Sequence, residues 1–137
     1  MKPLTRKRTA VMIIDDDEII LEITRDWLEG SGYDVSLRQS ALGTTAAIMR
    51  ERPDVLLVDV SMPALDGTAI ASMVSGPQKH SPIVILYSGR SQSELDQLAS
   101  RCGAFGGIPK TSSGSVFLAQ FERLVQAARS RTSSIPA

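Results

Sequence analysis

Short apolar runs alternate with longer amphipathic stretches along the chain, and this alternation limits the fold more than any other feature. Four of the runs have the length of a single β-strand: Ala10–Ile14, Asp54–Val58, Ile83–Tyr87 and Phe105–Ile108. The first two are apolar almost throughout, which is typical of strands buried on both faces of a sheet. Strands that alternate with helical stretches favour βα units. We therefore expect an α/β fold with a parallel sheet.

The stretches between these runs have the periodicity of amphipathic helices. We expect five helices, at Glu18–Glu29, Ala41–Arg52, Thr68–Val74, Ser91–Arg101 and Ser115–Arg129. A fifth and more polar strand is expected at Tyr33–Leu37, near an edge of the sheet. In the first helix, Ile19, Ile23 and Trp27 are spaced four residues apart, with Ile20 and Leu28 beside them, and they predict the side that faces the core. The segment Ser91–Glu94 matches a capping box, which predicts the start of the fourth helix.

Length and composition are those of one globular domain. The chain has 137 residues, of which 42% are hydrophobic and 22% charged, and this suffices for a single core. We expect an N-terminal extension at residues 1–9, the domain at residues 10–129 and a disordered, serine-rich tail at residues 130–137.

Charge and cysteine content argue against several classes of function. The formal net charge is zero, so nothing in the bulk charge attracts nucleic acid or an anionic membrane. No apolar run approaches the length that crosses a bilayer. Cys102 is the single cysteine, so no internal disulfide can form, and this is consistent with a cytoplasmic location.

A polar residue stands at or just after the C-terminal end of each of the four apolar runs. These residues are Asp15 and Asp16 after the first run, Asp59 after the second, Ser88 after the third and Lys110 near the fourth. In open parallel sheets, ligands bind at the edge where the C-terminal ends of the strands meet. We therefore expect these side chains to share one pocket.

The predicted pocket has the composition of a phosphoryl site that uses a divalent cation. Converging carboxylates repel one another, and at least one pKa rises unless a cation is present. Carboxylate oxygens and water suit Mg²⁺, whose coordination is commonly completed by a phosphate. Asp59 stands alone after a buried strand and is the best candidate nucleophile, because a carboxylate can form an acyl phosphate. Lys110 and Ser88 are expected to bind the phosphoryl oxygens from the opposite side.

With these residues, the chain resembles the receiver domain of two-component response regulators, including chemotaxis receivers. The resemblance extends from about Val11 to Arg129. Its strongest motif is the segment Asp59–Gly67, which is similar to the phosphoacceptor loop of the family, and the second is the acidic segment Ile13–Asp17. Ser88-Gly89 and Pro109-Lys110 stand where the family keeps a Ser or Thr before a small residue and an invariant Lys.

The resemblance implies both the topology and the metal site. The family fold is flavodoxin-like, a doubly wound sheet of five parallel strands in the order 2-1-3-4-5. Asp16 and Asp59 would then ligate Mg²⁺ directly, together with the backbone carbonyl of Ser61. Asp15 would act on the same ion through a water molecule.

The resemblance also implies the function. Asp59 would accept a phosphoryl group from a histidine kinase or a phosphotransfer protein, while Ser88 and Lys110 bind the phosphoryl oxygens. Such a domain phosphorylates and dephosphorylates itself but is not otherwise an enzyme. Phosphorylation would switch a surface, within the Ser91–Arg129 half, that an output protein binds. No direct contact with nucleic acid or membrane is expected.

Two positions depart from the family pattern, and two other functions remain open. The family commonly has Pro directly after the Lys, where this chain has Thr111. The family usually has an aromatic residue three positions before the Lys, where this chain has Gly107. This change favours the alternative of a pseudo-receiver, an interaction module that does not depend on phosphorylation. A second alternative is a phosphatase of the haloacid dehalogenase type, which also uses an Asp nucleophile with Mg²⁺. Those enzymes have a second Asp where this chain has Ser61.

Overall fold

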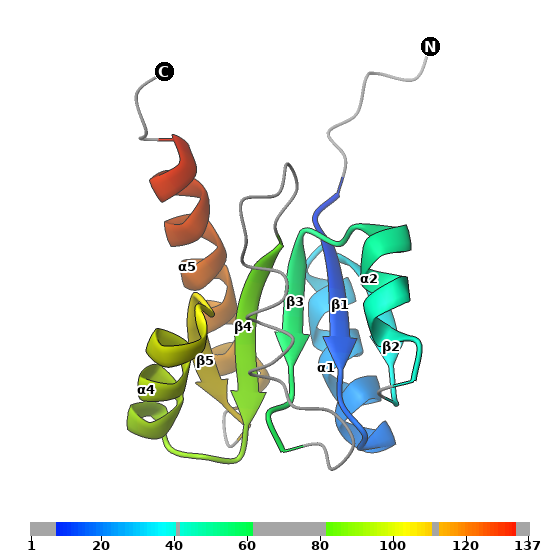
Figure 1. Ribbon diagram of the computed structural model, residues 1–137, viewed down its shortest axis with the longest axis horizontal. Coiled ribbons are helices and arrows are strands. Elements are labelled where there is room, and N and C mark those ends of the chain that lie inside the picture. Colours follow the sequence, from blue (N-terminus) through cyan, green and yellow to red (C-terminus); the bar gives the residue numbers. More distant parts are fainter. Residues whose placement is uncertain (1–7, 41, 62–81, 111–112, 134–137) are drawn as a thin grey trace.

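The computed structural model describes residues 8–40, 42–61, 82–110 and 113–133. Five strands pair in one parallel sheet whose order is β2-β1-β3-β4-β5, and in Figure 1 the strand arrows point the same way. The strands are β1 (Ala10–Ile14), β2 (Asp34–Arg38), β3 (Val55–Val58), β4 (Ile83–Ser88) and β5 (Gly106–Pro109). The predicted fold class and strand order are confirmed.

Four helices lie within the described residues: α1 (Glu18–Gly30), α2 (Thr44–Glu51), α4 (Gln92–Cys102) and α5 (Gly114–Ser133). The fifth predicted helix, Thr68–Val74, lies outside them. No helix in the described ranges is long and apolar enough to cross a membrane.

Helix α5 ends at Ser133, past the predicted end at Arg129, so the first residues of the predicted tail are helical. Two contacts of this last part of the helix explain the difference. The Arg129 guanidinium donates a hydrogen bond to the Thr9 hydroxyl at 2.6 Å, and the Arg131 guanidinium lies 5.5 Å from the centre of the Phe105 ring.

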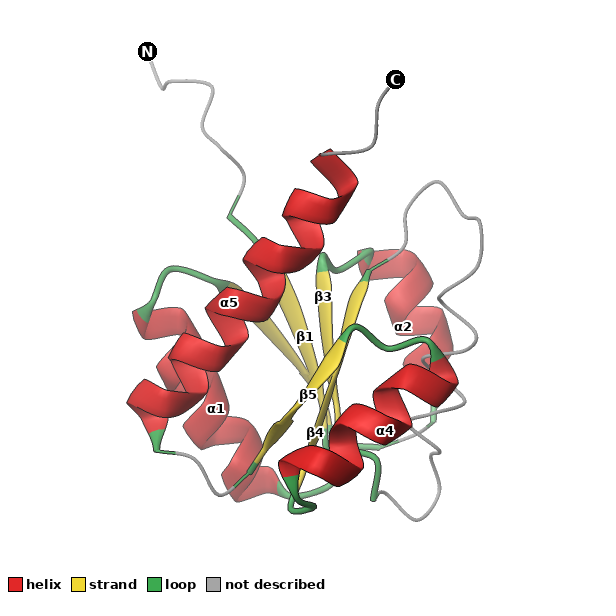
Figure 2. Ribbon diagram, turned by 90° about the vertical axis from the view of Figure 1, so that its left-hand side faces the viewer, coloured by secondary structure: helices red, strands yellow, loops and turns green. Residues whose placement is uncertain are grey.

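The sheet has a helical layer on each face, with α1 and α5 on one side and α2 and α4 on the other (Figure 2). Side chains alternate between the two faces along each strand. Met12 and Ile14 of β1 therefore pack with α2 and α4, whereas Val11 and Ile13 pack with α1 and α5. Because both faces are covered, β3 is buried throughout and β1 is buried from Val11 onward, as their sequences predict.

Helix α1 shows the core a face that overlaps the predicted one only in part. Leu28 is buried, and Ile20 and Trp27 are half-buried against the core as predicted. Ile19 and Ile23 are 67% and 40% exposed, and the fully covered positions are Leu21, Thr24 and Leu28. The apolar pattern was misleading because the core side of the helix includes a polar residue, Thr24, whose hydroxyl finds a partner inside the protein. The predicted role of Ile19 and Ile23 in the core is therefore wrong.

The start and end of α4 follow the sequence signals closely. The Ser91 hydroxyl accepts a hydrogen bond from the Glu94 backbone, and the Glu94 carboxylate accepts one from the Ser91 backbone, so the capping box is complete. Gly103 ends the helix with a φ of 84°, in the left-handed region that favours glycine. The capping box fixes the first turn of α4 directly after the loop that follows Ser88.

Candidate functional site

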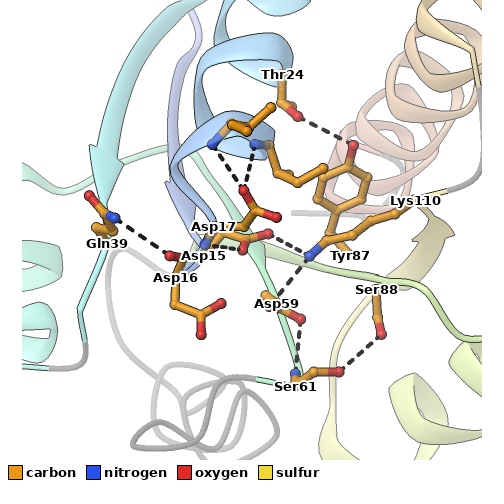
Figure 3. A network of polar contacts seen from close by, with 12 residues as sticks. Asp15, Asp16, Asp17, Thr24, Gln39, Asp59, Ser61, Tyr87, Ser88 and Lys110 are labelled. Carbon is orange, nitrogen blue, oxygen red and sulfur yellow. Dashed lines mark hydrogen bonds and ion pairs between the residues drawn. The ribbon is translucent and has the colours of Figure 1, made fainter.

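The predicted site residues come together at the edge of the sheet where the strands end. Backbone hydrogen bonds join the ends of neighbouring strands, from Asp59 N–H to the Ile14 carbonyl at 2.9 Å and from Lys110 N–H to the Ser88 carbonyl at 2.7 Å. Figure 3 shows the side chains of Asp15, Asp59 and Lys110 pointing toward one another. The structure thus brings these side chains together at one edge of the sheet.

Three carboxylates form the acidic part of the site. Asp15, Asp16 and Asp59 each offer an oxygen within 4.8 Å of the oxygens of the other two. Asp15 and Asp59 are buried, while Asp16 is exposed and leaves the cluster open to solvent. Carboxylate oxygens at this spacing, with room for water, fit a hard divalent cation. The cluster is thus able to hold a metal ion.

Lys110 supplies the positive charge of the site. Its ammonium group lies 2.7 Å from Asp15 Oδ2 and 3.4 Å from Asp59 Oδ2, and its side chain is 18% exposed. Burial alone would lower the pKa of Lys110, but the hydrogen bond and charge of Asp15, followed by the charge of Asp59, outweigh burial and raise it. The ammonium therefore stays charged and offsets part of the repulsion between the two carboxylates.

Burial is the dominant influence on the Asp15 carboxyl group. Burial raises the pKa of Asp15, and the hydrogen bonds from Lys110 and from the Asp17 backbone oppose this rise only in part. The Asp17 N–H donates to Asp15 Oδ1 at 2.9 Å, which leaves Oδ2 directed at Lys110.

Two serines lie on the other side of Asp59. The Ser61 N–H donates to Asp59 Oδ1 at 2.9 Å, so one carboxylate oxygen is fixed by the backbone while Oδ2 faces Lys110. The Ser61 and Ser88 hydroxyl oxygens are 3.4 Å apart, and Ser88 Oγ also accepts a hydrogen bond of 3.4 Å from the Arg90 N–H. These contacts place both hydroxyls beside the carboxylate. The rest of the phosphoacceptor-like loop, residues 62–67, lies outside the described residues.

Sequence reasoning missed a buried polar pair next to the site. The hydroxyl of Tyr87 is 3.3 Å from that of Thr24, and the Tyr87 ring centre is 5.7 Å from the Lys110 ammonium. Burial raises the pKa of Tyr87, against the opposing effects of the Thr24 hydrogen bond and the Lys110 charge, and the phenol is neutral. The available signal was the polar end of Tyr87, which needs a partner once the run Ile83–Tyr87 is buried.

At Gly107, the structure shows a close approach of α4 to β5. A hollow of about 370 Å³ lies between α4, β5 and α5, with the Gly106-Gly107 backbone among its walls. The amide of Gln92, at the start of α4, donates to the Gly107 carbonyl at 2.9 Å and accepts a hydrogen bond from Gln120 of α5 at 3.2 Å. One side chain thus connects all three elements.

Comparison with known proteins agrees with this geometry. Residues 11–122 match the family described as the response regulator receiver domain, and they include every side chain described at the site. The response regulator MprA of Mycobacterium tuberculosis is 32% identical over 120 residues, which are 85% of this chain and 50% of that protein. The transcriptional regulatory protein CseB of Streptomyces avermitilis is 29% identical over 120 residues, which are 88% of this chain and 50% of that protein. The chain therefore spans about half the length of these curated relatives.

Solved structures share the fold. The chemotaxis response regulator CheY4 of Vibrio cholerae superposes with a TM-score of 0.76 at 23% identity, over 86% of this chain and 99% of that one. A receiver domain protein from Methanospirillum hungatei superposes with a TM-score of 0.78 at 23% identity, over 91% of this chain and 99% of that one. With the sequence match over residues 11–122, we conclude that the chain belongs to the response regulator receiver domain family and takes part in two-component signalling through aspartyl phosphorylation.

Proposed function

We propose that Asp59 is the phosphorylated residue of this receiver domain. The observation that carries the proposal is the position of its carboxylate, which has Lys110 on one side and the Ser61 and Ser88 hydroxyls on the other. An oxygen of Asp59 attacks the phosphorus of the donor, a new P–O bond forms, and the bond between phosphorus and the donor atom breaks. The Lys110 ammonium and the Ser88 hydroxyl stabilise charge on the transferred oxygens.

The cofactor in this proposal is Mg²⁺, and the acidic cluster supports it. Asp16, Asp59 and the backbone carbonyl of Ser61 would hold the ion directly, with Asp15 acting through water. When bound, the ion neutralises charge on the phosphoryl group and on the carboxylates. The exposed carboxylate of Asp16 provides access from solvent, and the buried Asp15 and Asp59 provide the charge.

The domain is not an enzyme in the ordinary sense, and its activity on itself is part of the proposal. We expect small acyl phosphates to serve as donors, because Asp59, Lys110 and Ser88 are already placed together without a partner. Water that attacks the same phosphorus reverses the modification. The pseudo-receiver alternative is disfavoured by the intact set of site residues.

The protein donor is proposed to be a histidine kinase or a phosphotransfer protein that docks on α1. This helix begins directly after Asp15–Asp17, and its first turns expose Ile19 and Ile23 to solvent. Exposed apolar side chains on the helix that begins directly after the acidic segment suit a partner that must bring a phosphoryl group to Asp59. Replacement of Ile19 and Ile23 by serine should slow transfer from such a protein and leave transfer from acetyl phosphate unchanged.

The surface that responds is proposed to be the outer face of α4, β5 and α5. Ser88 is followed by a short loop and then by Gln92, whose amide contacts both β5 and α5. A shift of the Ser88 hydroxyl toward a phosphoryl oxygen would therefore move the start of α4 and strain these contacts. An output protein would read this change.

No direct contact with nucleic acid or membrane is proposed for this domain, given its zero net charge. CseB is named a transcriptional regulatory protein, and that name describes the longer relative. A cytoplasmic location is also part of the proposal, and it is supported by the single cysteine and the family assignment.

The test is modification by acetyl phosphate with Mg²⁺, followed by electrophoresis in a gel that retards phosphoproteins. We expect a shifted band for the wild-type protein and none for Asp59→Asn. Asp26→Asn, which changes an exposed carboxylate on α1, is the matched control and should shift like the wild type. A shifted band that persists in Asp59→Asn would show that phosphorylation occurs elsewhere.

A further inference from the structure

We propose that Tyr87 is a positioning residue for Lys110, and that its ring holds the ammonium group in place for the phosphoryl group. The inference rests on the proposed function of Asp59. It concerns an aromatic residue on β4, directly before Ser88, to which the family resemblance assigns no role.

The first observation is the contact between the ring and the charge. The Lys110 ammonium lies over the Tyr87 ring at 5.7 Å from its centre, within the distance at which a cation is attracted to an aromatic face. Tyr87 is 3% exposed and the Lys110 side chain is 18% exposed. Such an attraction is stronger where water is largely excluded, so the ring stabilises the ammonium at this position.

The second observation is that the ring itself is held on two sides. Its hydroxyl is 3.3 Å from the hydroxyl of Thr24, which is fully buried on α1. Its centre is 5.3 Å from the centre of the Phe117 ring on α5, in a tilted arrangement. Figure 3 shows Tyr87 beside the Lys110 chain with its hydroxyl directed at Thr24. The Tyr87 ring is thus held in one position between α1 and α5.

The third observation is the direction in which Lys110 would otherwise move. A lysine side chain has four rotatable carbon bonds and loses considerable rotamer freedom when it is held in one geometry. Asp15 and Asp59 attract the ammonium from one side, and the Tyr87 ring bounds it on another. Without the ring, the chain could swing away from the carboxylates. A charge that must be repositioned stabilises a transferring phosphoryl group less than a charge already in place.

The test combines two replacements of Tyr87 with one of Lys110. Tyr87→Leu removes the ring, Tyr87→Phe keeps it, and Lys110→Met removes the charge that the ring is proposed to hold. We expect Tyr87→Leu to lower the rate of modification by acetyl phosphate about three- to tenfold, which lies within the range of effects that a cation–π contact has. Tyr87→Phe should recover most of this loss. In the Lys110→Met background, Tyr87→Leu should cause no further loss.

Two further measurements separate positioning from a loss of structure. In the unmodified wild-type protein, NMR resonances of the Lys110 methylene groups next to the ammonium should show the ring-current shift of Tyr87, and Tyr87→Leu should remove it and average the Lys110 conformations. If Tyr87→Leu unfolds, Thr24→Val serves instead, because it releases the phenol and keeps the apolar volume. Thr24→Val should then weaken the same NMR signature.

The outcomes distinguish this inference from the proposed function. An equal loss of rate for Tyr87→Leu with and without Lys110, or unchanged Lys110 resonances in both Tyr87→Leu and Thr24→Val, would overturn the positioning role. If the wild-type protein is not modified at Asp59 but Tyr87→Leu still disorders Lys110, the positioning role stands and the proposed function fails.

Discussion

A Cβ atom on residue 107 would lie 2.6 Å from the Cβ of Leu95, closer than such atoms pack in folded proteins. Helix α4 therefore rests directly on the backbone of β5 at Gly107. An aromatic side chain at this position, as the family usually has, is incompatible with this placement of α4. In the proposed switch, the change at Ser88 therefore reaches the surface through other side chains, and Gln92 contacts both β5 and α5.

Gly107→Ala should lower the free energy of unfolding by about 1–3 kcal/mol, the usual cost of overpacking a buried site. The reason is that Leu95 Cβ is part of the α4 backbone framework and cannot turn away. Gly106→Ala is the matched control on the same strand, because its Cβ would meet the flexible end of the Leu124 side chain at 2.9 Å. Urea unfolding should show the smaller loss for Gly106→Ala, and equal losses would contradict the account of α4 packing.

Gln92→Ala should reduce the response of α5 to changes at the proposed phosphorylation site, and it should change the free energy of unfolding little. The hydrogen bonds of Gln92 are near the surface, and bonds of this kind contribute about 1 kcal/mol or less. We expect beryllofluoride with Mg²⁺ to shift NMR signals of Gln120 and its neighbours in the wild type and to shift them less in Gln92→Ala. Gln97→Ala, an exposed position on the same helix, is the control and should respond like the wild type. An undiminished response in Gln92→Ala would show that the hydrogen bonds of Gln92 do not transmit the change from the site to α5.

Lys110→Met should have opposite effects on stability and on Mg²⁺ affinity. Without metal, Asp15 and Asp59 lose their cationic partner, and the free energy of unfolding should fall by up to roughly 3 kcal/mol. Because a like charge near the ion is removed, Mg²⁺ should bind roughly tenfold more tightly. Urea unfolding in a chelator and calorimetric titration with Mg²⁺ measure the two effects. Arg101→Met, which removes an exposed cation from α4, should leave both unchanged, and weaker Mg²⁺ binding by Lys110→Met would speak against a shared site.

The capping box of α4 predicts a pH dependence of stability. Hydrogen bonds from the Ser91 backbone and hydroxyl lower the pKa of Glu94 below its ordinary value of 4.5. A carboxyl whose pKa is lower in the folded state stabilises the fold above that ordinary value, and this contribution is lost as the pH falls through the folded-state pKa. Glu94→Gln should therefore be less stable than the wild type at neutral pH and approach it at acidic pH.

Thermal unfolding between pH 7 and pH 3 checks this prediction. Glu22→Gln, at an exposed position on α1, is the matched control. Ser91→Ala removes the other half of the box and should cost about 1 kcal/mol at neutral pH. A constant difference between Glu94→Gln and the wild type across this range would show that the carboxylate charge is not involved.

Much of the fold was predictable because its signals are local. Buried parallel strands are apolar throughout, and caps such as Ser91–Glu94 and Gly103 are read directly from residue type. The location of Asp15, Asp59, Ser88 and Lys110 at one edge followed from the direction of parallel strands. These predictions needed no knowledge of how side chains pack.

The remaining features depend on partners that are distant in the sequence. The core face of α1 was predicted only in part, because Thr24 is buried with its hydroxyl against Tyr87, which is 63 positions away. The ion pair between Lys110 and Asp15 joins the ends of β5 and β1, which are separated in the sheet by two strands, and no local pattern encodes it. The close approach at Gly107 could be suspected from two adjacent glycines, but the identity of Leu95 as the neighbour could not.

The side chains of the acidic pocket project from the strand ends, whereas Gly106 and Gly107 lie inside β5 and face the outer helices. The proposed phosphorylation site and the proposed responding surface thus lie in different parts of one small domain. Surface residues of α4 and α5 could therefore be replaced so that the domain binds a different output protein. We expect such replacements to leave the lifetime of the acyl phosphate at Asp59 unchanged.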